Sequence, residues 1–121
     1  MKYIIEPTRT TPFVSMDKES GVFEMKGVSS PENTLEFFNP IFKEFETYEL
    51  ETLEFNMALE YFNTSSSKCI FQLLKSVKKL SSDGKDVVIN WIYDEEDEDM
   101  REVGEDYCDL LDLEMNYMTI S

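Results

Sequence analysis

The amino-acid sequence predicts an α/β fold, a single two-layer domain in which an N-terminal β-hairpin joins a mostly parallel sheet with about three helices. The first observation is the order of segments, because stretches with helical spacing of apolar residues alternate with strand-like stretches after the hairpin. Short connections between such elements are typical of right-handed crossovers and parallel strands. The second observation is the apolar–polar alternation of residues 53–61, which indicates a strand with one exposed face. We therefore expect one domain over residues 1–121, with its helices mainly on one side.

The N-terminal hairpin is predicted from three short stretches, "KYII", "PFVSMD" and "GVFEMKG", the last of which follows the turn-rich "KESG". The first helix is expected in "SSPENTLEFFNPIFKEFETY", because Ser30 can cap it and Pro31 suits the first helical position. Pro40 is expected to kink or split this helix, since proline lacks a backbone N–H. Spacings of three and four predict its apolar stripe: Leu35, Phe38, Phe42 and Phe45.

The remaining elements follow from the same two periodicities. The strand at 53–61 is expected to direct five side chains inward: Leu53, Phe55, Met57, Leu59 and Tyr61. The next helix is expected to bury six: Cys69, Ile70, Leu73, Leu74, Val77 and Leu80. "DVVINWIY" then predicts a central strand, and "EMNYMTI" predicts the last one. Between them, a third helix is predicted from the helical spacing of Met100, Val103, Tyr107 and Leu110.

Composition excludes several classes of protein. The formal charge of −15 argues against nucleic acid or an anionic membrane as a partner, and no stretch approaches the roughly 20 apolar residues of a membrane span. The chain contains no histidine, so a Ser/His or Cys/His nucleophile system is impossible within it. Its four glycines are scattered singly, which excludes a Gly-rich phosphate loop. We expect no enzyme, cofactor or metal site, and two buried thiols, Cys69 and Cys108, in a cytoplasmic protein.

Two polar segments follow predicted strands and should meet at one edge of the sheet, because the carboxyl ends of parallel strands share an edge with the helices that follow. The first is Asn63–Thr64–Ser65–Ser66–Ser67. One interpretation is helix capping by Asn63 or Thr64, which stabilises by about 1 kcal/mol. The other is phosphorylation of Thr64 or a neighbour, because the N–H groups and dipole at the start of a helix favour a phosphate. Lys68, one turn later, can contribute to its environment.

The second segment is the acidic run at 94–99, made of Asp94, Glu95, Glu96, Asp97, Glu98 and Asp99. The simplest interpretation is a solvated start of the third helix. The spacing fits a calcium loop poorly, since the central glycine and terminal glutamate are missing. A carboxylate-based Mg²⁺-dependent hydrolase is an alternative, with Asp94, Glu95, Asp97 and Asp99 as its candidate residues. An acidic inhibitor that mimics nucleic acid is another.

A partner-facing acidic surface is a further interpretation of this run, because charge is segregated along the chain. Residues 94–112 carry eleven acids against one arginine, a net −10, whereas residues 68–85 carry five lysines against one aspartate, a net +4. Segregated charge of this kind suits an electrostatically steered docking surface.

Five stretches in order, "TPFVSMD", "GVFEMKGVSSPENTLEFFNPI", "LEYFNTSSSK", "VINWIYDEEDEDM" and "GEDY", resemble the SiaC family of bacterial regulatory phosphoproteins over nearly the whole chain. "SSPEN" and "YFNTSS" are the specific motifs. The resemblance implies a fold like the anti-sigma-factor antagonist, or STAS-like, class. It also implies a non-enzymatic switch, phosphorylated by a cognate HATPase-type Ser/Thr kinase and dephosphorylated by a PP2C-type phosphatase.

The same resemblance places the phosphoacceptor at Thr64, with Ser65 as the second choice, and the phosphate environment at Asn63, Ser66 and Lys68. It implies that the unmodified form binds and activates an effector, a diguanylate cyclase, in cyclic-di-GMP signalling and biofilm behaviour. Because a phosphate on Thr64 would lie at the edge that carries the acidic run, like-charge repulsion and altered shape are expected to expel a partner docked there.

Overall fold

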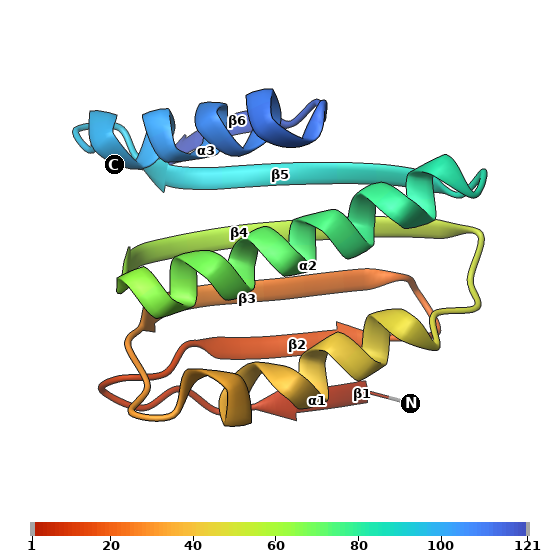
Figure 1. Ribbon diagram of the computed structural model, residues 1–121, viewed down its shortest axis with the longest axis horizontal. Coiled ribbons are helices and arrows are strands. Elements are labelled where there is room, and N and C mark those ends of the chain that lie inside the picture. The colour runs from red at the N-terminus through yellow and green to blue at the C-terminus, as the bar shows by residue number, and fades with distance from the viewer. Residues whose placement is uncertain (1, 121) are drawn as a thin grey trace.

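Strands and helices follow the predicted order in the computed structural model, which describes residues 2–120 (Figure 1). The elements are β1 (Lys2–Ile5), β2 (Phe13–Asp17), β3 (Val22–Ser29), α1 (Thr34–Glu46), β4 (Thr52–Phe62), α2 (Thr64–Ser82), β5 (Asp86–Asp94), α3 (Glu98–Leu111) and β6 (Asn116–Ile120). None of the helices described between residues 2 and 120 has the length and apolar character that crossing a membrane requires.

The six strands form one sheet in sequence order, β1-β2-β3-β4-β5-β6. β1 and β2, and β2 and β3, pair antiparallel, whereas β3, β4, β5 and β6 pair parallel. α1, α2 and α3 each connect two neighbouring parallel strands and lie on the same side of the sheet (Figure 1). The predicted hairpin, the mostly parallel sheet and the one-sided helix layer are therefore confirmed within a single α/β domain.

The core lies between the helices and one face of the sheet. Phe23 of β3 stacks on Phe55 of β4 at 4.8 Å between ring centroids, and Phe45 of α1 meets Phe23 edge-on at 5.1 Å. All six α2 side chains that were predicted to be inward are buried, which confirms the helical period of this segment. Cys69 is one of them, whereas Cys108 of α3 is only half-buried, and both thiols are free.

The first helix begins later than predicted. Its N-cap is Asn33, whose side chain accepts a hydrogen bond from the Glu36 N–H at 3.1 Å, so the prediction of Ser30 as cap is wrong. Ser30 is engaged elsewhere, because its N–H donates to the Thr10 carbonyl at 2.7 Å and its hydroxyl accepts from Asn63. Pro40 lies inside α1 without splitting it. Pro40 has no N–H to donate to the carbonyl of Glu36, and both residues lie on the exposed side of the helix.

Two leucines that belong to the apolar spacings used to predict α1 and α3 are exposed, because each lies off the buried face of its helix. Leu35 is 62% exposed in α1, where the buried face consists of Phe38, Ile41 and Phe45. At about 3.6 residues per turn, Leu35 lies nearly a quarter turn from the centre of that face. Leu110 is 71% exposed in α3 for the same reason, and Leu111 packs against the core instead.

Tyr61 is a third correction, since it was predicted to be inward and is 56% exposed. β3 pairs Gly27 with Leu59 but the next residue, Val28, with Tyr61, so Glu60 is an additional residue in β4. This β-bulge interrupts the alternation of side chains after Leu59 and turns Tyr61 outward.

Candidate functional site

The junction between β4 and α2, residues 63–67, is held by its own cap and by the end of β3. The side chain of Asn63 accepts a hydrogen bond from the Ser66 N–H at 2.8 Å, which confirms helix capping by Asn63. The Asn63 N–H donates to the Ser29 carbonyl at 3.0 Å, and its side-chain amide donates to the Ser30 hydroxyl at 3.4 Å. The start of α2 is therefore fixed both locally and against the β3–α1 connection.

The hydroxyl groups of the junction divide into two kinds. Ser66 is fully buried and accepts a hydrogen bond from the Ser29 hydroxyl at 2.9 Å. Ser67 is half-buried, and its hydroxyl lies 2.7 Å from the hydroxyl of Tyr107 in α3. Thr64 and Ser65, by contrast, are exposed. Two of the four hydroxyls thus hold the helix start in place, and two are accessible to another molecule.

Tyr107 joins the junction to α3. Its hydroxyl also donates to the Ser67 carbonyl at 3.1 Å, so the Ser67 hydroxyl is the donor in the bond between the two side chains. Burial raises the pKa of Tyr107, which keeps this hydroxyl neutral and able to donate. Sequence reasoning missed Tyr107 and Ser29 as site residues. Ser29 is 37 residues from Ser66 in the sequence and Tyr107 is 40 residues from Ser67, so no local pattern pairs them.

Ser66→Ala is expected to lower the free energy of unfolding by about 1–3 kcal/mol, because it leaves the buried Ser29 hydroxyl without a partner. Ser29→Ala with Ser66→Ala is expected to cost clearly less than the sum of the single changes, since neither polar group then remains. Urea unfolding of the four proteins measures this coupling. Ser65→Ala, on an exposed hydroxyl, is the control, and strictly additive losses at positions 29 and 66 would contradict the assignment.

The acidic run starts at the end of β5 and enters α3. Asp94 is the last residue of β5, and its carboxylate accepts from the Glu96 N–H at 2.9 Å. Asp97 is the N-cap of α3 and accepts from the Met100 N–H at 3.1 Å. Its other members, Glu95, Glu96, Glu98 and Asp99, are exposed, the last two in the first turn of α3. Part of the run therefore builds the helix start, and most of its charge faces solvent.

The fold brings Thr64 and the acidic run to the same edge of the sheet. β4 and β5 are parallel neighbours, so the start of α2 and the loop after β5 both lie at their carboxyl ends, on the left in Figure 1. Lys68 is exposed one turn after Thr64. Among residues 2–120, no three acidic, cysteine or histidine side chains are grouped as metal ligands, so the hydrolase alternative gains no support here.

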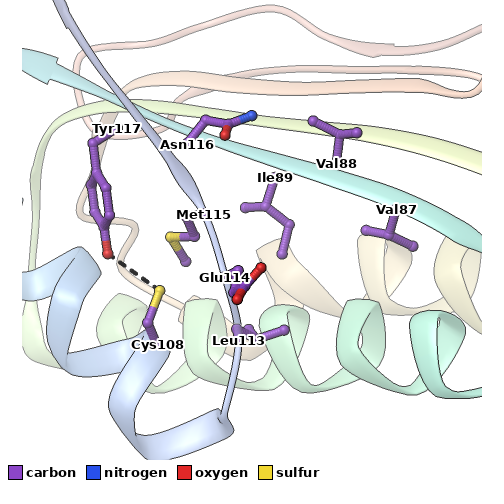
Figure 2. A pocket seen from close by; sticks show the side chains of 9 residues that line it. All are labelled: Val87, Val88, Ile89, Cys108, Leu113, Glu114, Met115, Asn116 and Tyr117. Atoms are coloured by element: carbon purple, nitrogen blue, oxygen red, sulfur yellow. Dashed lines mark hydrogen bonds between the residues drawn. The ribbon is translucent and has the colours of Figure 1, made fainter.

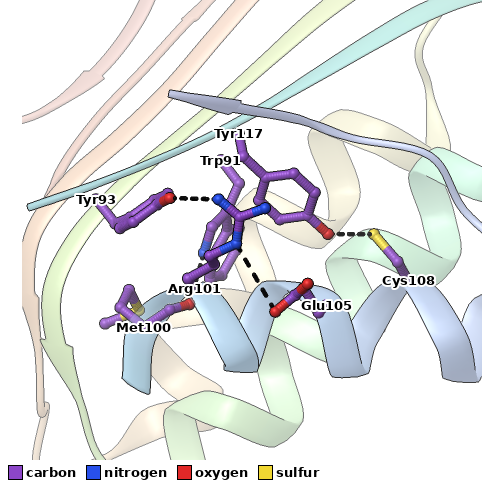
Figure 3. A network of polar contacts seen from close by, with 7 residues as sticks. All are labelled: Trp91, Tyr93, Met100, Arg101, Glu105, Cys108 and Tyr117. Carbon is purple, nitrogen blue, oxygen red and sulfur yellow. Dashed lines mark hydrogen bonds and ion pairs between the residues drawn. The ribbon is translucent and has the colours of Figure 1, made fainter. Parts of the chain in front are cut away.

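A network of polar and aromatic contacts holds α3 on β5 and β6 (Figure 3). Arg101 donates to the Tyr93 hydroxyl at 2.9 Å and lies over the ring of Tyr117 at 5.1 Å from its centroid. The Tyr117 hydroxyl lies 3.3 Å from the Cys108 sulfur. Burial raises the pKa of Tyr117. Trp91 of β5 donates to the Met100 carbonyl at 2.9 Å. These contacts fix the helix that carries the acidic run.

A cavity of about 500 Å³ is shown in Figure 2. It lies near the start of β5, at the opposite end of the strands from the start of α2 (Figure 1). It is lined by the start of β5, the end of α3 and the connection to β6, among them Val87, Ile89, Cys108 and Met115. None of the site residues predicted from the sequence lines it, so the candidate site remains the edge that holds Thr64.

Comparison with known proteins agrees with these observations. A family model described as SiaC family regulatory phosphoprotein matches residues 5–120. A protein of Pseudomonas aeruginosa (strain UCBPP-PA14), described as the uncharacterized protein PA14_02130, is 31% identical over 106 residues, which cover 85% of this chain and 84% of the relative.

Solved structures extend the similarity to the fold. The crystal structure of apo-SiaC from Pseudomonas aeruginosa superimposes with a TM-score of 0.90 at 26% identity, covering 98% of this chain and 99% of that one. SiaC in a crystal structure with the diguanylate cyclase SiaD, where SiaC is described as its activator, gives a TM-score of 0.91 at 27% identity over the same shares. The chain therefore belongs to the SiaC family of regulatory phosphoproteins.

Proposed function

We propose that this protein is a non-enzymatic interaction module whose phosphorylation on Thr64 controls the binding of an effector. The observation that carries the proposal is the division of hydroxyls at the β4–α2 junction. Ser66 and Ser67 are engaged with Ser29 and Tyr107, whereas Thr64 and Ser65 are exposed. In a regulatory phosphoprotein, the accessible hydroxyls are the ones a kinase can reach, and Ser65 is the second choice.

The phosphoryl group would come from ATP, through a HATPase-type Ser/Thr kinase, and a PP2C-type phosphatase would remove it by hydrolysis. Both partners act in the cytoplasm, where we place the switch. A phosphate on the Thr64 oxygen would stand beside the first N–H groups of α2, whose dipole favours negative charge. Lys68 is the one cation we assign to this environment. The Ser66 N–H and hydroxyl are already bonded, to Asn63 and Ser29, so they act by holding the helix start rather than by binding phosphate.

The effector we propose is a diguanylate cyclase, bound by the unmodified protein in cyclic-di-GMP signalling that governs biofilm behaviour. The support is the structural neighbour that is described as the activator of such a cyclase. The exposed acids of the run would steer a basic partner to this edge over a distance. We place the cations of that partner on the acidic run and an uncharged part of it on Thr64, where a buried dianion without a paired cation is costly.

Incubation with the cognate kinase and ATP is expected to add one phosphate to the protein, located at Thr64 by intact-mass and fragment-ion analysis. Thr64→Ala should abolish the modification. Ser65, the other exposed hydroxyl residue of the junction, points in a different direction from the helix axis, because successive helical residues are about 100° apart. Ser65→Ala is the matched control and should be phosphorylated like the unaltered protein. Undiminished phosphorylation of Thr64→Ala would reject the assignment of the acceptor.

A further inference from the structure

The face of the sheet that the helices leave open carries a second feature of the molecule. Side chains alternate along each strand, so those at every second position point away from the helix layer. Figure 2 shows this for Val88 and Asn116, which point away from the helices, whereas Val87, Ile89 and Tyr117 point toward them. Within residues 2–120 no element covers this open face.

Over β4, β5 and β6 the open face has an apolar strip, which we define as Ala58, Ile92, Met118 and Ile120, and Ile92 lies opposite Met118 in the register of β5 and β6. Two of these are large side chains with much of their surface in water, because Met118 is 48% exposed and Ile120 55%. Val88, 43% exposed, lies on the same face but is separated from the strip by Asn90. Single exposed apolar residues are ordinary, but several that adjoin on neighbouring strands are typical of an interaction surface.

A ladder of asparagines crosses the same three strands. Asn90 donates to the Asn56 side-chain carbonyl at 2.7 Å, and Asn116 donates to that of Asn90 at 3.0 Å. The direction of the ladder is set by Glu54, a carboxylate that can only accept and takes the Asn56 amide at 2.9 Å. Each amide must therefore present its oxygen to the next strand. Asn116 is the last member of the ladder, and its side-chain oxygen is left to accept from a donor outside the ladder.

Charge on this part of the face has one sign. The outward positions of β4 and β5 include Glu54, Glu60, Asp86 and Asp94, and the outward positions of the three strands include no lysine or arginine among the described residues. A second copy of the chain would bring the same acids against these, which is unfavourable. A partner that fits must instead supply cations around an apolar centre, and hydrogen-bond donors for Asn116.

A depression of about 450 Å³ marks where such a cation would lie. Three of its lining residues belong to the apolar strip, Ala58, Ile92 and Ile120, and the small side chain of Ala58 leaves room above β4. Its acids are Glu60, Asp94, Glu96 and Asp97. An apolar wall beside carboxylates suits the aliphatic stem and charged head of a lysine or arginine.

We propose that the open face of β4–β6 is a docking surface for an amphipathic helix of a partner protein, with apolar side chains on the strip and a lysine or arginine in the depression. A helix fits better than a strand, because a strand would pair with the free edge of β6 and leave the face uncovered. The surface lies on the other side of the sheet from α2. Docking here is consequently independent of a free Thr64 hydroxyl, although the depression shares Asp94, Glu96 and Asp97 with the acidic run that we assign to the effector.

The test is an NMR titration of the isotope-labelled protein with a synthetic helical peptide that carries leucines on one face and lysines on its flanks. Saturable shifts are expected at the methyl groups of the apolar strip and at the side-chain amides of Asn90 and Asn116. Met118→Glu is expected to weaken binding at least tenfold. Leu110→Glu, at an exposed apolar position on α3, is the control and should bind as before. Thr64→Glu should not weaken binding.

Three outcomes would overturn the proposal: absence of saturable shifts, shifts confined to the helix layer, or equal losses for the variants at positions 118 and 110. A dimer that Met118→Glu dissociates would show instead that a second copy covers the face. The titration uses neither kinase nor cyclase, so a negative result would not bear on the proposed switch at Thr64. Likewise, a failure to phosphorylate Thr64 would not bear on this docking surface.

Discussion

Gly104→Ala is expected to lower the free energy of unfolding by about 1–3 kcal/mol, although alanine is the better helix former by about 1 kcal/mol. A Cβ atom at this position of α3 would lie 2.8 Å from both Cδ1 and Nε1 of the Trp91 indole. Trp91 is 1% exposed and bonded to the Met100 carbonyl, so its ring cannot move aside. The helix must instead shift away from the sheet, which strains the bond between Tyr107 and Ser67 at the candidate site.

Urea unfolding followed by fluorescence measures this loss, because Trp91 is the one tryptophan of the chain and lies at the contact. Asp106→Ala, on the exposed side of the same helix, is the control and should change stability by less than about 0.5 kcal/mol. Equal stability of the two variants would show that α3 does not rest on Trp91 as closely as described.

The elements with long, regular patterns were predictable from the sequence. α2 shows this best, because its six inward side chains follow one helical period and all are buried. The alternation of β4 likewise predicted the buried side chains as far as Leu59. In both cases the pattern is set by neighbours along the chain, so no knowledge of the rest of the fold was needed.

What the sequence could not predict depends on residues far apart in the chain. The bulge that turns Tyr61 outward exists only in the pairing of β4 with β3. The local sequence favoured Ser30 as the helix cap. In the structure Ser30 is bonded to Thr10 and Asn63, and Asn33 is the cap. Local signals of similar strength were present at both positions, and tertiary contacts decided between them.

At the candidate site, the sequence predicted the junction and its cap but could not sort its hydroxyls. From local pattern alone, Thr64, Ser65, Ser66 and Ser67 were equivalent as acceptors, and only the family resemblance favoured the first. Ser66 and Ser67 are distinguished by Ser29, 37 residues away, and Tyr107, 40 residues away. The presence of four consecutive hydroxyl residues therefore has a partly structural reason, since two of them join α2 to β3 and α3.

Phosphorylation of Thr64 is expected to weaken effector binding at least tenfold, equivalent to about 1.4 kcal/mol. The phosphate adds roughly −1.5 to −2 charges at a position that a docked partner must cover. The acids at the neighbouring strand end offer it no counter-charge, and Lys68 is exposed, so its charge is screened by water. Desolvation and bulk at Thr64 thus oppose the complex, whereas the Ser29–Ser66 and Tyr107–Ser67 contacts keep the backbone in place. We expect no large change of fold.

The most direct measurement is calorimetric titration of the effector cyclase into unmodified protein and into protein phosphorylated to completion by its kinase. Thr64→Ala carried through the same kinase reaction is the control, and it should bind with the affinity of the unmodified protein. The account predicts an affinity at least tenfold lower for the phosphorylated protein alone. Equal or tighter binding of the protein phosphorylated on Thr64 would contradict it.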